Sequence, residues 1–214
     1  PLSKQAVLEG LVSVQAALES ASRPVHAIFI RRGKQTRALA RVERLARDHN
    51  VPLERVEDET IAAHASGKTH GGVVALVGPR RFVELQDLLR TSTAPFVVML
   101  DGIEDPFNFG AAVRALYAAG ADGLVVRPRN WMSAAGIVAR SSAGATEWMP
   151  TAVAETVFDA AHQARARGLC VACAAKDRAV SIYRTDLAIP LFCVIGGEKR
   201  GVCGHGHNRF CALL

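Results

Sequence analysis

Short apolar segments alternate with helical segments through the second half of the sequence, and this alternation limits the fold more than any other feature. Apolar segments of strand length fall at residues 96–100, 124–126, 169–174 and 191–195. Helical patterns separate them at residues 109–119, 133–142 and 154–167. Such alternation is typical of an α/β fold, with a mostly parallel sheet and helices on both faces. Ligands bind these sheets beyond the carboxyl ends of the strands, so we expect a site in the loops after Leu100, Ala174 and Ile195.

The first 80 residues predict a smaller α/β unit. Val7, Leu8, Leu11 and Leu18 recur at helical spacing, which predicts a helix over residues 4–19. Further strands are expected at 25–30, 53–56 and 73–77, with helices at 36–49 and 58–65. The chain is therefore divided into a domain over residues 1–80, a linker over 81–94 with a short helical patch at 83–90, and a larger domain over 95–214.

Composition excludes several classes of protein. No apolar run reaches the length of a transmembrane helix, and the N-terminus has no secretory signal pattern, so we expect a cytoplasmic protein that does not enter a membrane. The five cysteines are odd in number and lie in the last quarter, which argues against a disulfide framework. The net charge of +6 fits a polyanionic partner.

Basic residues are densest in one stretch near the N-terminus. Arg31, Arg32 and Lys34 begin this stretch, and Arg37, Arg41, Arg44 and Arg47 continue it. A solvated helix face and a contact with RNA phosphates explain the pattern equally well. Downstream, the segment SGKT at 66–69 lacks the first glycine of a phosphate-binding loop, because position 62 is Ala62, and this excludes an ATPase.

The loop after Leu100 concentrates residues with special conformational or chemical properties. Asp105-Pro106 indicates a turn, and Asn108 is suited to cap the next helix while its amide faces a ligand. Gly110 leaves room for a close backbone approach, and Arg114, about one turn into the predicted helix, could reach an anion. An ordinary strand-to-helix turn explains each feature separately, whereas the combined spacing is more specific.

The loop after Ile195 has a similar character. An apolar strand runs into Gly196-Gly197 and then Glu198. Two glycines after a strand let a ligand lie against bare backbone. Glu198 could orient a neighbouring arginine or hydroxyl group.

Together these two loops resemble the motifs of a known family. The pattern Asp-x3-Asp-Pro-x-Asn-x-Gly-Ala-x2-Arg over residues 101–114 resembles the first motif of the SpoU (TrmH-like) branch of the SPOUT superfamily of RNA 2'-O-ribose methyltransferases. Gly-x-Glu-x2-Gly over residues 196–201 resembles the second motif, and ARSSAGATEWMP at 139–150 resembles the Ser/Ala-Gly-Ala segment between them. AVLEGLVSVQAAL, VHAIFIRRG and GKTHGGVVALV look like the family's N-terminal substrate-binding domain, which is similar to ribosomal protein L30e.

This resemblance implies a trefoil-knotted SPOUT-type sheet, S-adenosylmethionine as cofactor, and methyl transfer to a ribose 2'-hydroxyl of RNA, with rRNA favoured over tRNA. It also implies a homodimer. The implied catalytic residues are Arg114, Asn108 and Glu198, and the implied cofactor contacts are Ile195, Gly196 and Gly197. The implied RNA contacts are Arg31, Arg32, Lys34, Lys68 and His70.

The sequence departs from the family after Gly201. The segment VCGHGHNRFCALL does not resemble the third motif, which completes the knot in the family, so we expect an incomplete knot. A truncation, a frameshift and a genuine divergence all fit this ending. A catalytically impaired RNA-binding protein is therefore the alternative to an active enzyme. Cys203, His205, His207 and Cys211 do not have a standard zinc spacing, and no metal site is predicted.

Overall fold

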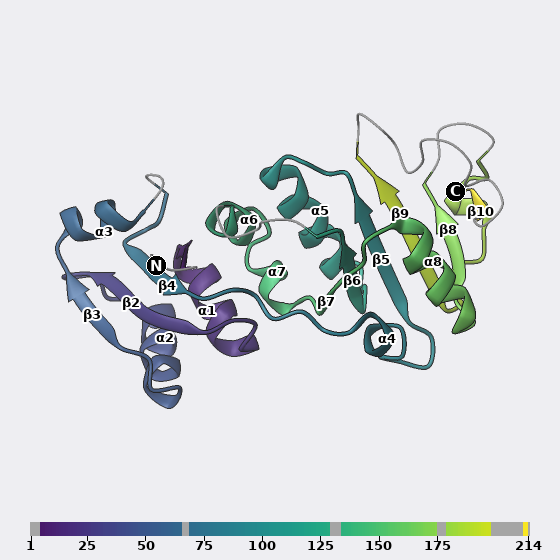
Figure 1. The fold of residues 1–214 in the computed structure, drawn as a ribbon. Coiled ribbons are helices and arrows are strands. Elements are labelled where there is room, and N and C mark those ends of the chain that lie inside the picture. Colours follow the sequence, from purple (N-terminus) through teal and green to yellow (C-terminus); the bar gives the residue numbers. More distant parts are fainter. Residues whose placement is uncertain (1–4, 66–68, 129–133, 175–178, 198–211, 214) are drawn as a thin grey trace. The chain divides into compact units, whose positions relative to one another are not determined.

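The computed structural model describes residues 5–65, 69–128, 134–174, 179–197 and 212–213 (Figure 1). These residues form two compact units, each built around its own sheet. The first unit comprises the described residues of Pro1–Arg81, Pro106–Arg114 and Asn130–Trp148. The second unit comprises those of Phe82–Asp105, Ala115–Arg129 and Met149–Leu214.

The sheet of the first unit is mixed. Its strands are β1 (Ala6–Glu9), β2 (Val25–Arg31), β3 (Leu53–Val56) and β4 (Val73–Val77), in the order β1-β4-β2-β3. Only β2 and β3 run parallel, whereas β4 is antiparallel to both of its neighbours. This order confirms three predicted strands and places an additional strand, β1, at one edge of the sheet.

Three helices of the first unit follow the strands closely in sequence. They are α1 (Leu11–Ser20), α2 (Arg37–Asp48) and α3 (Asp58–His64). Thr36 caps α2 through its side-chain oxygen, which accepts a hydrogen bond of 3.1 Å from the Leu39 amide. Leu39, Val42 and Ala46 form the buried stripe of α2, and its arginines lie on the exposed side.

The predicted helix over residues 4–19 is wrong in its first half. Residues 6–9 form β1, which pairs with β4 from Ala6↔Val77 to Glu9↔Val74. Gly10, with φ of 87°, then turns the chain into α1. The helical spacing of the apolar residues was misleading because pairing with a distant strand satisfies the backbone of 6–9 and buries Leu8 completely.

Helix α6 (Ala135–Ser141) packs on the first unit although it lies far along the chain. Ala135 and Ala139 belong to the same apolar core as the strands and helices of the N-terminal region. Gly136 permits this packing, because a Cβ there would lie 2.6 Å from the Val7 carbonyl oxygen. Arg140 donates to Glu9, with 2.9 Å between Nη1 and Oε2.

A buried carboxylate ties helix α7 (Ala145–Trp148) to the same unit. The Glu147 side chain forms a two-pronged ion pair with Arg23, with both N···O distances at 2.9 Å, and it accepts a hydrogen bond from the Ser22 hydroxyl. Arg80 approaches at 3.9 Å. Burial lowers the pKa of the Arg80 guanidinium to about 10, with Glu147 opposing and Arg23 reinforcing this shift, so Arg80 stays cationic at neutral pH.

The second unit contains a six-stranded sheet whose pairs are all parallel. Its strands are β5 (Phe96–Asp101), β6 (Gly123–Val126), β7 (Thr151–Val153), β8 (Cys170–Cys173), β9 (Leu191–Gly196) and β10 (Ala212–Leu213), in the order β10-β8-β9-β5-β6-β7. The predicted α/β fold with a parallel sheet is confirmed. The short elements α7, β7 and β10 are not among the elements expected from the sequence.

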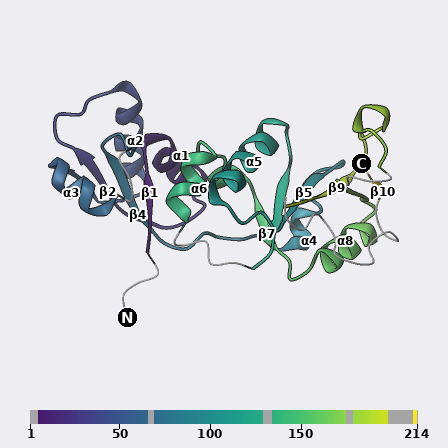
Figure 2. The same cartoon turned by 90° about the horizontal axis from the view of Figure 1, so that it is seen from above.

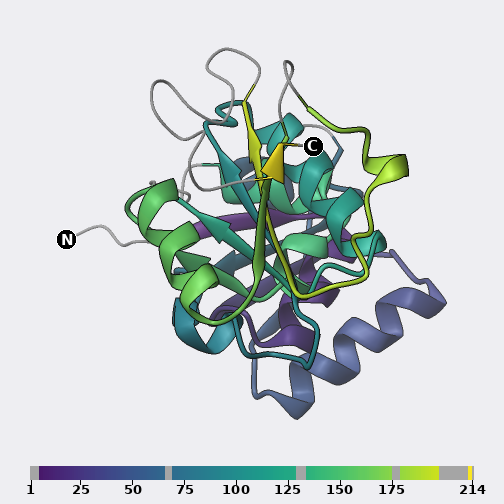
Figure 3. The ribbon, with the colours of Figure 1, turned by 90° about the vertical axis from the view of Figure 1, so that its right-hand side faces the viewer.

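Two helices cover one face of this sheet. Helices α4 (Leu85–Leu88) and α8 (Val157–Ala166) lie on the same side of β5 and β9 (Figure 2). Their small and branched side chains share one core with Met99, Phe192 and Val194 of the strands. The short 3₁₀ helix η1 (Ile182–Arg184) lies on the opposite side of the sheet from α8 (Figure 3).

Two predictions about architecture stay predictions. The domain boundaries near residues 80 and 95 are not tested by the two compact units, which interleave along the chain. The predicted knot and its incompleteness depend on residues 198–211, which lie outside the described residues. No helix in the described ranges is both long and apolar enough to cross a membrane.

We predict that Glu147→Gln destabilises the protein by about 3–5 kcal/mol, because it leaves Arg23 buried without its counter-charge. Urea unfolding followed by circular dichroism measures this loss. Glu57→Gln is the matched control, since it breaks an ion pair with Arg32 that is exposed on both sides, and it should cost less than about 1 kcal/mol. Equal losses in the two variants would contradict a structural role for the buried cluster.

Candidate functional site

The two loops singled out in the sequence leave the second sheet side by side. Strands β5 and β9 are parallel neighbours, and their last paired residues are Leu100↔Ile195 and Asp101↔Gly196. Both loops therefore begin at the same edge, where the carboxyl ends of the strands lie. This is the edge at which parallel sheets bind ligands.

The backbones of these two loops touch. The Gly197 amide donates a hydrogen bond of 2.7 Å to the Asp101 carbonyl oxygen. A Cβ on Gly197 would overlap the Gly102 carbonyl oxygen and lie 2.6 Å from its carbon. Gly102 itself has φ of 75°, which favours glycine. Close approach of two chain segments thus already accounts for Gly197, while Ile195 and Gly196 are half-buried.

A carboxylate at this edge has one unused oxygen. The Oδ1 atom of Asp101 is buried and accepts no hydrogen bond from any described residue. It lies 3.6 Å from Nη1 of Arg127, whose side chain is exposed. A buried acceptor without a donor is unfavourable unless a ligand supplies one. The Asp101 carboxylate therefore suits a ligand that carries hydroxyl or ammonium groups.

The helix of the first motif begins earlier than predicted. Helix α5 spans Pro106–Ala118, with Pro106 as its first residue. Asn108 consequently lies within the first turn, and its predicted role as the helix cap is wrong. The fixed φ of proline and its missing amide hydrogen suit the first helical position, which explains why the helix starts there.

Arg114 lies farther along α5 than the sequence suggested, about two turns after Pro106. Its side chain is exposed, and no carboxylate of a described residue lies within ion-pair distance. Six residues separate Asn108 from Arg114, which corresponds to about 9 Å along the helix axis and about 120° around it. Both side chains are exposed, but they point in different directions from the helix.

Gly110 is explained by helix packing. A Cβ at this position would overlap the Ser141 hydroxyl of α6 and lie 2.8 Å from the Val138 carbonyl oxygen. Ser141 also donates to the Pro106 carbonyl oxygen at 3.3 Å. The close approach predicted for Gly110 is therefore present, and the approaching group is a helix of the same unit.

Several predicted residues lie outside the described part of the chain. They are Glu198, Lys68, and the possible zinc ligands Cys203, His205, His207 and Cys211. Among the described residues, no group of three or more His, Cys, Asp or Glu side chains could hold a metal ion.

The predicted RNA-contacting residues of the first unit differ in availability. Arg31 and Arg32 are exposed, and they form ion pairs with Asp58 and Glu57. Lys34 is half-buried within the turn that follows β2. His70 is only 9% exposed, and its Nδ1 accepts a hydrogen bond of 3.0 Å from the Gly72 amide, so it offers little surface to a partner.

The first sequence motif includes Asp101 but assigns it no role, and no sequence pattern points to the ion cluster around Glu147. A polar residue at the end of an apolar strand was a usable signal for Asp101. No local pattern joins Arg23 to Glu147, because 124 positions separate them.

Comparison with known proteins gives two family matches. Residues 95–208 match the SpoU rRNA methylase family. Residues 7–83 match the family described as RNA 2'-O ribose methyltransferase substrate binding. The substrate-binding match precedes the methylase match along the chain, as the resemblance in the sequence implies.

Individual proteins agree with these matches. The chain is 31% identical over 205 residues to the 23S rRNA (guanosine-2'-O-)-methyltransferase RlmB of Pseudomonas putida, covering 94% of this chain and 82% of the relative. RlmB of Escherichia coli is 26% identical over 200 residues, covering 92% and 82%.

Two solved structures share the fold. The AdoMet-bound rRNA methyltransferase from Sinorhizobium meliloti superimposes with a TM-score of 0.79 at 22% identity, over 98% of this chain and 77% of that one. The SpoU methyltransferase AviRb from Streptomyces viridochromogenes in complex with AdoMet gives 0.75 at 18% identity, over 99% and 81%.

We predict that Gly110→Ala destabilises the protein by about 1–3 kcal/mol, because the added methyl group overlaps α6. Helix propensity alone predicts the opposite sign, a gain of about 1 kcal/mol. Chemical denaturation measures the difference. Ala111→Gly, at the exposed neighbouring position, is the control and should show only the propensity loss of about 1 kcal/mol. A stabilised Gly110→Ala variant would contradict the close contact.

Proposed function

Because this chain belongs to the SpoU rRNA methylase family, we propose that it transfers the methyl group of S-adenosylmethionine to a ribose 2'-hydroxyl of ribosomal RNA. The observation that carries the proposal is the pairing of β5 with β9, which brings the starts of both family motifs to one edge of the sheet. The relatives named above act on 23S rRNA, and this makes 23S rRNA the proposed substrate class.

The described residues at this edge fit S-adenosylmethionine. The cofactor carries ribose hydroxyls and an ammonium group, and the unused Oδ1 of Asp101 can accept a hydrogen bond from either. Gly196 and Gly197 lie next to Asp101 and have no side chains, so a ligand there would meet bare backbone. We propose Ile195, Gly196 and Gly197 as cofactor contacts. Asp101 is a further proposed contact, because its buried Oδ1 has no hydrogen-bond donor among the described residues. The bound cofactor supplies the electrophilic methyl group.

Arg114 is the proposed catalytic residue. A ribose hydroxyl must lose its proton as it attacks, and a guanidinium cannot take that proton because it is already protonated. Arg114 instead binds an RNA phosphate and stabilises the negative charge that develops on the 2'-oxygen. Its exposed side chain, without a carboxylate partner among the described residues, is free for this role. Asn108 and Glu198 are proposed to position the substrate.

We also propose a cytoplasmic homodimer. The family resemblance implies the dimer, and apolar side chains on the surface of the second unit supply contact area for one. Among them, Tyr183 is 92% exposed and Ile182 is 50% exposed. The cysteines are odd in number and lie in the last quarter of the chain, which agrees with a reducing compartment.

We predict that Arg114→Ala lowers methyl transfer by at least about 100-fold, because the charge developing on the 2'-oxygen loses its stabilising cation. Transfer of tritiated methyl from S-adenosylmethionine to a 23S rRNA transcript measures the rate. Calorimetric binding of S-adenosylmethionine and the unfolding midpoint should be unchanged, since Arg114 is a surface residue. Full activity would overturn the assignment of Arg114. Absence of both cofactor binding and transfer in the unmodified chain would instead favour an RNA-binding protein without activity.

We predict that changing Arg31, Arg32 and Lys34 together to glutamine weakens RNA binding. The slope of the logarithm of the binding constant against the logarithm of the salt concentration should fall in magnitude by about one for each phosphate that the variant no longer neutralises. Filter binding of a 23S rRNA transcript across a KCl series measures both quantities.

Glu57→Gln combined with Asp58→Asn provides a control of opposite sign for this prediction. It removes the carboxylates that neutralise Arg32 and Arg31, so RNA should bind more tightly. Weaker binding in this double variant would contradict a role for the two arginines in RNA contact.

A further inference from the structure

A cavity opens at the edge of the second sheet opposite the two motif loops. Its volume is about 370 Å³, within the range of roughly 300–1,000 Å³ that is usual for small-ligand sites. Pro95, Leu169 and Pro190 line it, and each directly precedes a strand, β5, β8 or β9. Since these strands are parallel, the cavity lies at their amino ends.

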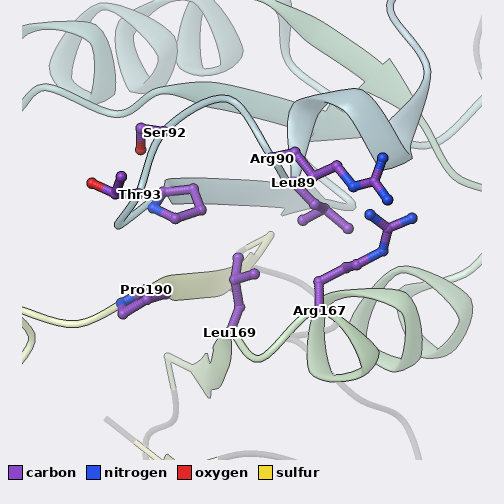
Figure 4. Close-up of a pocket in the computed structure, with 8 residues that line it drawn as sticks. Leu89, Arg90, Ser92, Thr93, Arg167, Leu169 and Pro190 are labelled. Atoms are coloured by element: carbon purple, nitrogen blue, oxygen red, sulfur yellow. The ribbon is translucent and has the colours of Figure 1, made fainter.

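Two arginines meet at one end of this cavity. Figure 4 shows the guanidinium groups of Arg90 and Arg167 pointing toward one another from the ends of α4 and α8. Two like charges directed at the same space repel each other unless an anion lies between them. The cavity therefore has a cationic end that is suited to an oxyanion.

The cationic charge at this end is not neutralised by the protein. Of the described residues, no carboxylate lies within ion-pair distance of either guanidinium, and none lines the cavity. Arg167 donates one hydrogen bond of 3.1 Å to the neutral Gln86 side chain, which orients it without removing its charge. Arg167 also ends α8, where the helix dipole stabilises a cation.

The other end of the cavity has a different chemistry. Figure 4 places Ser92 and Thr93 away from the arginines, with the side chains of Leu89 and Leu169 between the two ends. The cavity thus runs from a cationic end, over an apolar floor, to neutral hydroxyl groups. A nucleotide matches this order, because its phosphate is anionic and the attached sugar and base offer apolar faces and hydrogen-bonding groups. An isolated oxyanion would use the cationic end alone.

We propose that this cavity binds a backbone phosphate of the RNA substrate between Arg90 and Arg167, with the attached nucleoside over Leu89 and Leu169. The proposal rests on the proposed function, which supplies the RNA. Arginine forks match phosphate oxygens in pairs, which makes two convergent arginines a strong phosphate site. The six residues of β5 separate the cavity from the motif loops by roughly 20 Å, so it is a contact remote from the methylated ribose.

The test uses the full chain and the double variant Arg90→Gln plus Arg167→Gln. Filter binding of a 23S rRNA transcript across a KCl series should show affinity weaker by on the order of tenfold and a salt slope smaller by about one. The loss of methyl transfer should appear as a higher KM for RNA, because both residues contact the RNA and neither is near the motif loops.

Two controls separate the loss of this site from other effects. Gln86→Ala removes the hydrogen bond to Arg167 but no charge, and Arg184→Gln removes one exposed positive charge of the same unit outside the cavity. Both should leave the salt slope unchanged. The unfolding midpoint of the double variant should match that of the unmodified protein.

An unchanged affinity and slope in the double variant, with normal methyl transfer by the unmodified chain, would overturn the cavity proposal alone. Absence of RNA binding by the unmodified chain would overturn the proposed function and the cavity proposal together. A third experiment measures the ³¹P line width of inorganic phosphate, which broadens when phosphate binds the protein. If the double variant abolishes this broadening but leaves RNA binding intact, the cavity takes a free oxyanion and the RNA assignment is wrong.

Discussion

The parallel pairing of β5 with β9 is the constraint on which the candidate site depends. It sets Asp101 beside Gly196, and the next residues of both chain segments then have to pass each other at backbone distance. Only glycine at position 197 permits that passage, because any side chain would overlap the Gly102 carbonyl group. The same geometry buries one oxygen of Asp101 without a donor. Strand pairing therefore determines the shape of the sheet edge that is proposed to bind the cofactor. It also leaves an Asp101 oxygen at that edge able to accept a hydrogen bond from a ligand.

The first unit is held together by a different interaction, a carboxylate removed from water. Glu147 is paired with Arg23 inside the protein, and Arg80 adds a second cation nearby. Such a cluster contributes little net stability compared with an apolar core, but it tolerates no loss of one partner. Its effect is to join segments that are distant in sequence. The segment that resembles the family's Ser/Ala-Gly-Ala motif is thereby anchored beside the N-terminal sheet, and α6 is joined to strand β1 through Arg140 and Glu9.

The distribution of paired and unpaired arginines decides which parts of the surface suit RNA. Arg31 and Arg32 lie in the densest basic region, yet each has an acidic neighbour at the start of α3 that competes with a phosphate. Arg90 and Arg114 stand in less basic sequence but have no carboxylate partner among the described residues. Counting charges along the sequence therefore overstates the first region and overlooks the cavity at the amino ends of the strands. Local ion pairing, rather than net charge, determines where a polyanion gains most from binding.

The sequence by itself determined the α/β class, the parallel sheet and the family, because these depend on strand–helix alternation and on motif spacing along one chain. It also located the two loops that meet at the carboxyl edge. Only the tertiary structure decided that residues 6–9 form a strand, since their partner β4 lies more than sixty positions away. It alone assigned Gly110 to helix packing, moved Asn108 inside α5, and brought Arg90 to Arg167. Local patterns encode which elements form, whereas contacts between distant segments decide what each side chain faces.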